Sequence, residues 1–227
     1  MTENEQPYKI PNDWHWAMVG DVAALHRGVS FTKDDVHKAK QADDILIIRG
    51  GNVKEGYIDL ETDNVYVSKN LVSETQIIKK NDIVVVASTA SVNVIGRAGI
   101  ADRDYSDVAC GGFLMLVRPS ENVIPSYVDY FFQSDFYRKR IRNLAAGTNI
   151  NNIRNKHILD TPIPLPSLDE QQRIAGRIES LFAKLNRVEE KLSNIMGYND
   201  LKNTTMGKIY LMRKTILARA FRGKLGN

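Results

Sequence analysis

The sequence predicts an α+β fold, in which a strand-rich domain is followed by a long coiled-coil helix and a second C-terminal helix. Three observations indicate this class. Short β-branched runs recur through the first 120 residues, with connections too short for repeated βαβ units. The segment 162–166, Pro-Ile-Pro-Leu-Pro, then interrupts the chain, because proline cannot continue a helix. Beyond it, apolar residues recur at alternating spacings of four and three, the pattern of a coiled coil.

Strands are predicted where short apolar runs are bounded by turn residues. Residues 45–53 form a buried strand that a Gly-Gly turn stops, and residues 82–87 form the clearest strand. Residues 94–101 and 113–119 form two more, and the polar segment 88–93 is a loop between two buried strands. An earlier segment, 11–26, is expected to supply the core side chains Trp14, Trp16, Val19, Val22 and Leu25.

Helices are predicted in the second half of the chain. Residues 125–144 fit one helix, because apolar side chains recur there at near-helical spacing, and the turn-rich segment 147–152 ends it. Ser167 is a natural N-cap of the long helix and begins a Ser-x-x-Glu capping box. A second amphipathic helix runs to about Phe221, and Gly223 ends it.

These elements divide the chain into two predicted domains, residues 1–166 and residues 167–227. No apolar run approaches the roughly 18 residues that span a bilayer, and the acidic N-terminus lacks the pattern of a signal peptide. We therefore expect a cytoplasmic protein without a membrane partner. The single cysteine, Cys110, excludes an internal disulfide and a Cys-based zinc cluster, and a buried apolar role is favoured for it.

The distribution of charge is more informative than the net charge of +4. Residues 1–166 carry 19 Lys/Arg against 21 Asp/Glu, and residues 167–204 carry six of each. The tail 205–227 carries six basic residues and no acidic one. A protein whose first domain is nearly neutral would have to bind nucleic acid through a local basic surface, because it has no strong overall positive field.

Motifs of catalysis are absent from the sequence. There is no Gly-x-x-x-x-Gly-Lys-Ser/Thr loop, no Gly-x-Gly-x-x-Gly after a strand, and no Asn/Asp-Pro-Pro-Tyr/Phe element of an amino-methyltransferase. The four histidines lack the pairwise spacing of metal ligands. We therefore predict no catalytic residue, no metal site and no cofactor in this chain.

Candidate binding residues are easier to find. The 19-residue segment 138–156 contains six basic residues, and an amide-rich loop lies between the first four and the last two. Lysine and arginine neutralise phosphates, while asparagine, threonine and arginine hydrogen-bond base edges. A solvated helix face is the alternative interpretation, and the sequence leaves both open. The candidate nucleic-acid contacts are Ser88, Thr89, Ser91, Asn93, Arg97, Arg138, Lys139, Arg140, Arg142, Thr148, Asn149, Asn151, Asn152, Arg154 and Lys156.

The long helix carries an apolar seam that something must cover, because an exposed stripe of this size is unfavourable in water. Either a second copy or another part of the same chain covers it. The charges beside the seam do not decide between parallel and antiparallel pairing, because each exposed pair contributes only about 0.3–0.5 kcal/mol. The predicted dimer contacts are Ile174, Ile178, Leu181, Leu185, Val188, Leu192 and Ile195.

Several of these segments resemble the specificity subunit of type I restriction–modification systems. The matching stretches are 10–14 (IPNDW), 81–85 (NDIVV), 95–97 (IGR), the proline-rich segment, 170–174 (EQQRI) and 216–225 (ILARAFRGKL). The resemblance covers essentially the whole chain. It implies an α+β domain that recognises DNA and a helical region that spaces it from a second such domain. It also implies docking of modification subunits, which bring S-adenosylmethionine, and of restriction subunits, which bring ATP and Mg²⁺, so the chain itself is non-catalytic.

The chain departs from this family in one respect, because typical members hold two recognition domains and two helical regions and this chain has one of each. It is therefore either a half-subunit or a fragment. Our hypothesis is that two copies pair through the seam into a symmetric homodimer that reads a bipartite target. The competing interpretation is a non-catalytic helical scaffold that docks partner proteins without binding DNA itself.

Overall fold

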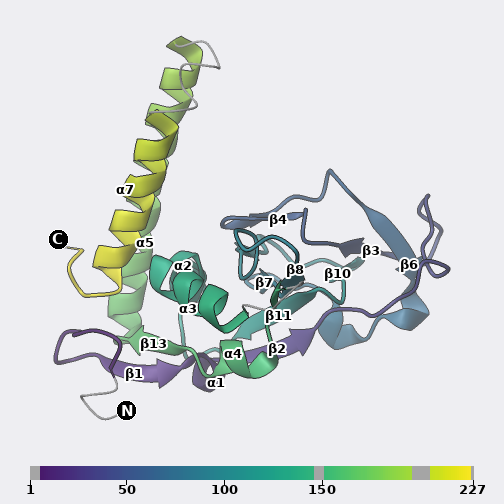
Figure 1. Ribbon diagram of the computed structural model, residues 1–227, viewed down its shortest axis with the longest axis horizontal. Coiled ribbons are helices and arrows are strands. Elements are labelled where there is room, and N and C mark those ends of the chain that lie inside the picture. Colours follow the sequence, from purple (N-terminus) through teal and green to yellow (C-terminus); the bar gives the residue numbers. More distant parts are fainter. Residues whose placement is uncertain (1–5, 146–150, 196–204, 226–227) are drawn as a thin grey trace.

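The computed structural model describes residues 6–145, 151–195 and 205–225. A head built on several small sheets lies beside a rod of two long helices (Figure 1). The rod consists of α5 (Leu168–Ile195) and α7 (Thr205–Ala220), which pack side by side. Within the described residues, no helix combines the length and the apolar character that crossing a membrane requires.

The largest sheet of the head has four strands in the order β2-β11-β7-β9, all antiparallel. Alternate residues of its two central strands point to opposite faces of the sheet. Both sets of side chains are apolar and buried, so the sheet is covered on both faces. Ile83, Val85, Met115 and Val117 face the helices, and Val84, Val86, Leu114 and Leu116 face the second sheet. The four strands are β2 (Ala23–Arg27), β7 (Ile83–Val86), β9 (Ala98–Ile100) and β11 (Leu114–Pro119).

The second sheet has three strands in the order β10-β3-β6, with β10 parallel to β3. The predicted strand 45–53 is divided here, because the turn at Gly50-Gly51 separates β3 from β4. The cysteine of β10, Cys110, is fully buried, and burial raises the pKa of its thiol to about 12. The elements of this region are β3 (Asp44–Ile48), β4 (Val53–Lys54), β5 (Tyr57–Ile58), β6 (Val65–Ser68), η2 (Lys69–Leu71), η3 (Glu74–Gln76) and β10 (Val108–Cys110).

Two predicted segments differ from the structure. Only residues 98–100 of the predicted strand 94–101 pair, because the preceding residues form a turn in which Gly96 has a φ of +71°. Two of the predicted core residues, Trp16 and Leu25, are half-buried, whereas the other three are buried.

The single helix predicted over 125–144 is wrong, because Ser134 interrupts it. The chain forms α2 (Pro125–Gln133) and α3 (Asp135–Ala145), with Ser134 in an extended conformation between them. The Ser134 amide donates to the carbonyl of Phe131, and its hydroxyl accepts from the amide of Tyr137 at 3.3 Å. One serine thus ends the first helix and begins the second.

The proline-rich segment is extended, as predicted. It forms β13 (Pro162–Leu165), which pairs antiparallel with β1 (His15–Met18) in a two-stranded sheet. The hydroxyl of Tyr127 donates to the carbonyl of Pro164 at 2.7 Å, which ties this strand to α2. The remaining short elements are α1 (Val19–Val22), β8 (Ser88–Thr89), β12 (Asn151–Asn152) and α4 (Asn155–Leu159).

The head and the base of the rod share one hydrophobic cluster. Gln171 at the start of α5 accepts from the amide of Ile124 at 2.9 Å and donates to the carbonyl of Pro166 at 3.0 Å. Ile174 and Ile178 are buried in this cluster with residues of α2. The prediction that these two isoleucines contact a second copy is therefore wrong, because they are covered by their own chain. The division at 166/167 stays a prediction.

The other seam residues are less buried. Leu181, Leu185 and Leu192 are half-buried, and Val188 is 48% exposed. The side chain of Ile195 lies outside the described residues. Half of the predicted capping box is present, because Ser167 Oγ accepts from the amide of Glu170 at 3.4 Å. The carboxylate of Glu170 binds Arg173.

Candidate nucleic-acid interface

Two polar segments that are far apart in the sequence meet at one end of the four-stranded sheet. β8 pairs antiparallel with β12, so that Ser88 lies opposite Asn152. The amide of Ile153 donates to the carbonyl of Ala87 at 2.8 Å and extends this pairing. Figure 1 shows β8 close to the ends of β7 and β11. The structure therefore brings together the described ends of the two polar segments that the sequence proposed as base contacts, and there they form short strands instead of loops. Of the other candidates there, Thr148, Asn149 and the side chain of Asn151 lie outside the described residues.

A third segment reaches the same place from β2. Arg27, the last residue of that strand, donates from Nε to Oδ1 of Asn155 at 3.1 Å. Arg27 is exposed, and its main-chain carbonyl accepts from Gln76. Sequence reasoning missed Arg27 and Asn155, because nothing in the local pattern connects residues that are 128 positions apart.

Three of the predicted cations are exposed, at the start of α4 and on α3, the helix that contacts both α4 and β12. Lys139 on α3 is exposed, as are Arg154 and Lys156 at the start of α4. The ammonium of Lys156 lies 3.9 Å from the carboxylate of Asp160 and is largely exposed. Such long cationic side chains at a polar surface suit contact with phosphates. We call Lys139, Arg154 and Lys156 the cation set.

Arg138 does not belong to the cation set. It is 4% exposed, and it donates from Nη1 to the carbonyl of Ile95 at 2.9 Å and from Nη2 to the carbonyl of Asn93 at 2.7 Å. Burial lowers the pKa of this guanidinium. The prediction that Arg138 grips phosphate is wrong, because its side chain points inward and holds the 91–96 turn against α3.

Two neighbouring arginines are half-buried and partly engaged. Arg142 donates to the same Asn93 carbonyl at 3.5 Å, and Arg140 donates to the carbonyl of Asp160 at 3.2 Å. The side chains of Ser91 and Asn93, which the sequence also proposed as contacts, are exposed on the turn that Arg142 contacts. Arg138 and Arg142 thus hold the 91–96 turn, and Arg140 instead ties α3 to the end of α4.

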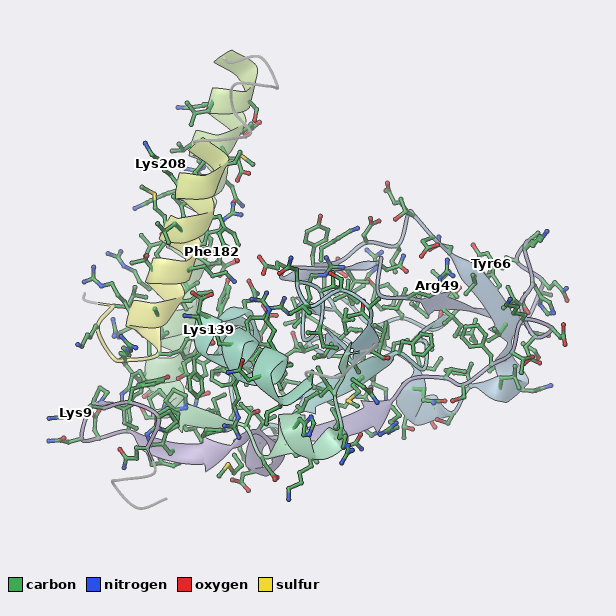
Figure 2. All side chains as sticks on the ribbon, viewed as in Figure 1. Lys9, Arg49, Tyr66, Lys139, Phe182 and Lys208 are labelled. Carbon is green, nitrogen blue, oxygen red and sulfur yellow. The ribbon has the colours of Figure 1, made fainter. Side chains whose placement is uncertain are left out.

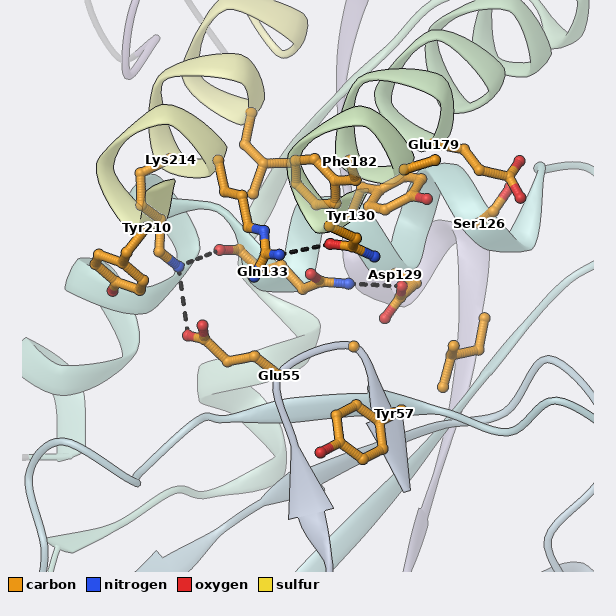
Figure 3. A pocket seen from close by; sticks show the side chains of 16 residues that line it. Glu55, Tyr57, Ser126, Asp129, Tyr130, Gln133, Glu179, Phe182, Tyr210 and Lys214 are labelled. Carbon is orange, nitrogen blue, oxygen red and sulfur yellow. Dashed lines mark hydrogen bonds and ion pairs between the residues drawn. The ribbon is translucent and has the colours of Figure 1, made fainter. Parts of the chain in front are cut away.

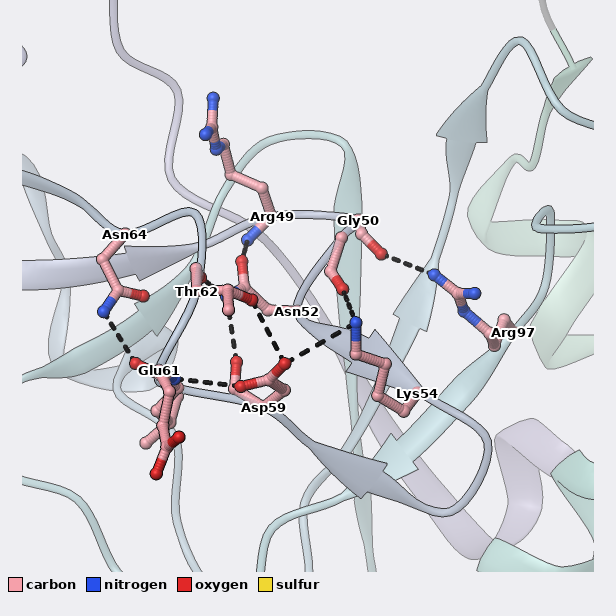
Figure 4. A network of polar contacts seen from close by, with 11 residues as sticks. Arg49, Gly50, Asn52, Lys54, Asp59, Glu61, Thr62, Asn64 and Arg97 are labelled. Carbon is pink, nitrogen blue, oxygen red and sulfur yellow. Dashed lines mark hydrogen bonds and ion pairs between the residues drawn. The ribbon is translucent and has the colours of Figure 1, made fainter. Parts of the chain in front are cut away.

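Arg97 has a similar supporting role. It is half-buried and donates from Nη2 to the carbonyl of Gly50 at 2.8 Å (Figure 4). In the same network, Asn52 donates to the carbonyl of Asp59 at 2.9 Å and Lys54 to the carbonyl of Gly51 at 2.7 Å. Arg97 therefore ties the end of the 91–97 turn to the turn between β3 and β4.

A cavity of about 630 Å³ lies where the head meets the rod (Figure 3). The β4–β5 hairpin, α2, α5 and α7 line it. Asp129 on its wall is 4% exposed and accepts from Gln133 at 2.7 Å. Burial raises the pKa of this carboxyl to about 8. Lys214 of α7 is also buried and donates to the carbonyl of Gln133 at 2.9 Å, with Glu55 at 3.4 Å.

The raised pKa of Asp129 predicts a pH-dependent stability. The pKa of this carboxyl is higher in the folded chain than in the unfolded chain, so the folded chain keeps the carboxyl protonated up to about pH 8. Its contribution to the free energy of unfolding is therefore present at low pH and is lost as the pH rises from about 4 through 8. The variant Asp129→Asn has a side chain at this position that is uncharged at every pH. We expect it to raise the melting temperature at pH 8 by at least roughly 2–4 °C, which corresponds to about 1 kcal/mol, and by less at pH 5. Calorimetry at both pH values measures this, and an equal effect at both would contradict it.

Comparisons with known proteins agree with these features. Residues 11–195 match the profile of the type I restriction modification DNA specificity domain. The chain is 37% identical over 187 residues to the type I restriction enzyme StySPI specificity subunit of Salmonella potsdam. It is 34% identical over 187 residues to the EcoKI specificity subunit of Escherichia coli strain K12. Each alignment covers 82% of this chain and 40% of the relative, so the chain spans less than half the length of these curated relatives.

Solved structures share the fold. The HsdS subunit from Thermoanaerobacter tengcongensis aligns with a TM-score of 0.58 at 18% identity, covering 97% of this chain and 48% of that one. A chain from a structural study of type I R-M complex assembly aligns with a TM-score of 0.59 at 19% identity, covering 97% of this chain and 49% of that one. These likenesses confirm the predicted α+β fold. Because the profile match covers most of the residues, this chain belongs to the type I restriction–modification DNA specificity family.

Proposed function

We propose that this chain is a DNA-specificity subunit that recognises one half of a bipartite target and docks modification and restriction subunits. The observation that carries the proposal is the convergence of Ser88, Asn152 and Arg27 at one end of the sheet, near the cation set. Family membership supports it. Together these features supply what sequence-specific binding needs, a phosphate-gripping surface beside groups that hydrogen-bond base edges.

The chain contributes recognition in this proposal, and its partners contribute the chemistry. The cation set holds the phosphate backbone, and the side chains of Ser88 and Asn152 approach base edges. S-adenosylmethionine is expected on the modification subunits, and ATP with Mg²⁺ on the restriction subunits. No catalytic role is assigned to this chain.

We also propose that two copies pair through their rods, because a single copy leaves apolar side chains of the rod exposed. The rod exposes large apolar side chains, including Val188 at 48%, Leu211 at 65% and Met212 at 53%. Burial of such side chains in a two-fold interface is favourable by about 25 cal/mol per Å². A symmetric pair would hold two heads at a fixed separation and read a palindromic target with an unread gap.

Fluorescence anisotropy with labelled duplexes tests the DNA-binding proposal. The variant Lys139→Ala/Arg154→Ala/Lys156→Ala removes three charges, so the slope of log K against log salt is expected to become shallower by up to about 3. A matched control is Lys9→Ala/Lys208→Ala/Lys224→Ala, which removes three exposed charges elsewhere. Figure 2 shows Lys9 in the N-terminal segment and Lys208 on α7, both distant from Lys139.

The control variant should change the salt slope less than the cation-set variant does. An unchanged slope in the first variant would remove the cation set from the interface. If the chain assembled with modification subunits binds no duplex at low salt, the scaffold interpretation replaces the proposal.

A further inference from the structure

The turn between β10 and β11 is held rigidly from three sides. It closes on itself through the Leu114 amide, which donates to the carbonyl of Gly111 at 2.8 Å. The Gly111 amide donates to the carbonyl of Ile48 at 2.9 Å. The amides of Ala87 and Ser88 donate to the carbonyl of Phe113 at 2.9 and 3.0 Å. β3 and β7 thus fix the main chain of this turn.

β2 fixes the turn from the third side, through a close approach of two glycines. The amide of Gly28 donates to the carbonyl of Leu114 at 3.2 Å. A Cβ at Gly28 would lie only 2.1 Å from the carbonyl oxygen of Gly111, so only glycine fits here. The turn has no room to shift toward β2, and the residue at its tip is presented in a fixed position.

The residue at this tip is Phe113, whose side chain is 72% exposed. It is the most exposed of the large apolar side chains in the described part of the chain. Single exposed apolar residues are common, so exposure alone assigns no role. The position of Phe113 is more informative, because its main-chain carbonyl accepts a hydrogen bond from the amide of Ser88, which pairs with Asn152. An exposed aromatic residue therefore lies next to Ser88 and Asn152, whose side chains are proposed to approach base edges.

We propose that Phe113 is a specificity-determining residue whose ring contacts the C5-methyl group of a thymine in the major groove of the target. This inference rests on the proposed function. A phenyl ring forms no hydrogen bond, and the thymine methyl is the apolar group that base pairs present in the major groove. The hydroxyl of Ser88 and the amide of Asn152 suit the polar edges beside it. A rigid aromatic tip binds with little loss of conformational entropy.

The test replaces each thymine of the target with uracil, which lacks only the methyl group. The target is first identified by sequencing methylated adenines in cells that carry the system. Fluorescence anisotropy then compares the wild-type chain with Phe113→Ala, each assembled with its modification subunits. At one position, uracil is expected to weaken wild-type binding about fourfold, the equivalent of roughly 0.8 kcal/mol for one buried methyl group. Phe113→Ala is expected to be insensitive to that same substitution.

Two controls separate this role from a structural one. Phe113→Ala should keep the wild-type melting temperature and salt slope, because an exposed ring supports neither the core nor a phosphate contact. Tyr57→Ala removes a 58% exposed aromatic side chain from the β4–β5 hairpin, near the rod, and should leave the uracil effect unchanged (Figure 3).

Two results are distinguishable as failures. If every uracil substitution affects the wild type and Phe113→Ala equally, the methyl contact is wrong, even when the variant binds more weakly. If the wild-type assembly binds no target, the proposed function fails before Phe113 is tested.

Discussion

Replacing Arg138 with methionine is expected to abolish discrimination between target and random duplex. The guanidinium donates to the carbonyls of Ile95 and Asn93, and methionine leaves both without this donor. The Asn93 carbonyl keeps the donor from Arg142, but the buried Ile95 carbonyl loses this hydrogen bond. One unsatisfied buried carbonyl costs about 1–3 kcal/mol, so the free energy of unfolding should fall by about that amount. The 91–96 turn would lose its fixed position. Urea denaturation measures the stability, and anisotropy with target and random duplexes measures the discrimination.

Lys139→Met is the matched control, because Lys139 is the next residue of α3 and is exposed. It should keep the stability and the discrimination while making the salt dependence of binding shallower by about one unit. The opposite pattern, in which Arg138→Met changes only the salt slope, would return Arg138 to the phosphate-contacting role that the sequence predicted.

The second large effect is expected from Val188→Glu, which should convert the proposed homodimer into a monomer. Val188 is 48% exposed in a single copy, so a charge there is tolerated by the fold. In a two-fold interface the same change buries two carboxylates at once, and burying an unpaired charge is strongly unfavourable. Size-exclusion chromatography with light scattering at micromolar concentration measures the mass.

Two comparisons make the rod experiment decisive. Glu190→Ala alters a nearby exposed position of α5 and should leave the dimer intact. Ile178→Glu places a charge in the cluster of the head and should unfold it, which circular dichroism would show. A wild-type chain that is monomeric at micromolar concentration, or a Val188→Glu variant that still dimerises, contradicts the proposed pairing.

The buried strands and the proline-rich strand could be predicted because their signals are local. The run Ile83–Val86 has no polar residue, so it is buried wherever it lies, and prolines exclude a helix at residues 162–166. The break at Ser134 could not be predicted this way, because serine is tolerated within helices. It depends on hydrogen bonds that Ser134 makes at the junction of two helices.

The candidate site was less predictable, because charge alone does not say which side of a helix faces the core. Arg138, Lys139 and Arg140 are consecutive, and successive helical residues are turned by about 100°, so they cannot share one face. Arg138 and Arg142 are four apart and both reach the carbonyl of Asn93. Helical spacing therefore held a signal that a count of cations missed.

The apolar seam illustrates a related gap. Its periodicity correctly indicated a continuous apolar face on α5, but periodicity does not name what covers that face. Ile174 and Ile178 turned out to pack on α2, whereas Val188 remains exposed. The meeting of Arg27 with Asn155 depends on the topology of the sheet, which a single sequence does not encode locally.

The cluster shared by the head and the base of the rod has a consequence for protein engineering. A chimera that transplants a foreign head by joining it at residue 167 would sever contacts that Ile174, Ile178 and Phe221 make across that junction. The graft would leave these side chains facing a surface that never co-evolved with them. Exchanging specificities between relatives therefore requires the first turns of α5 and the end of α7 to travel with the donor head.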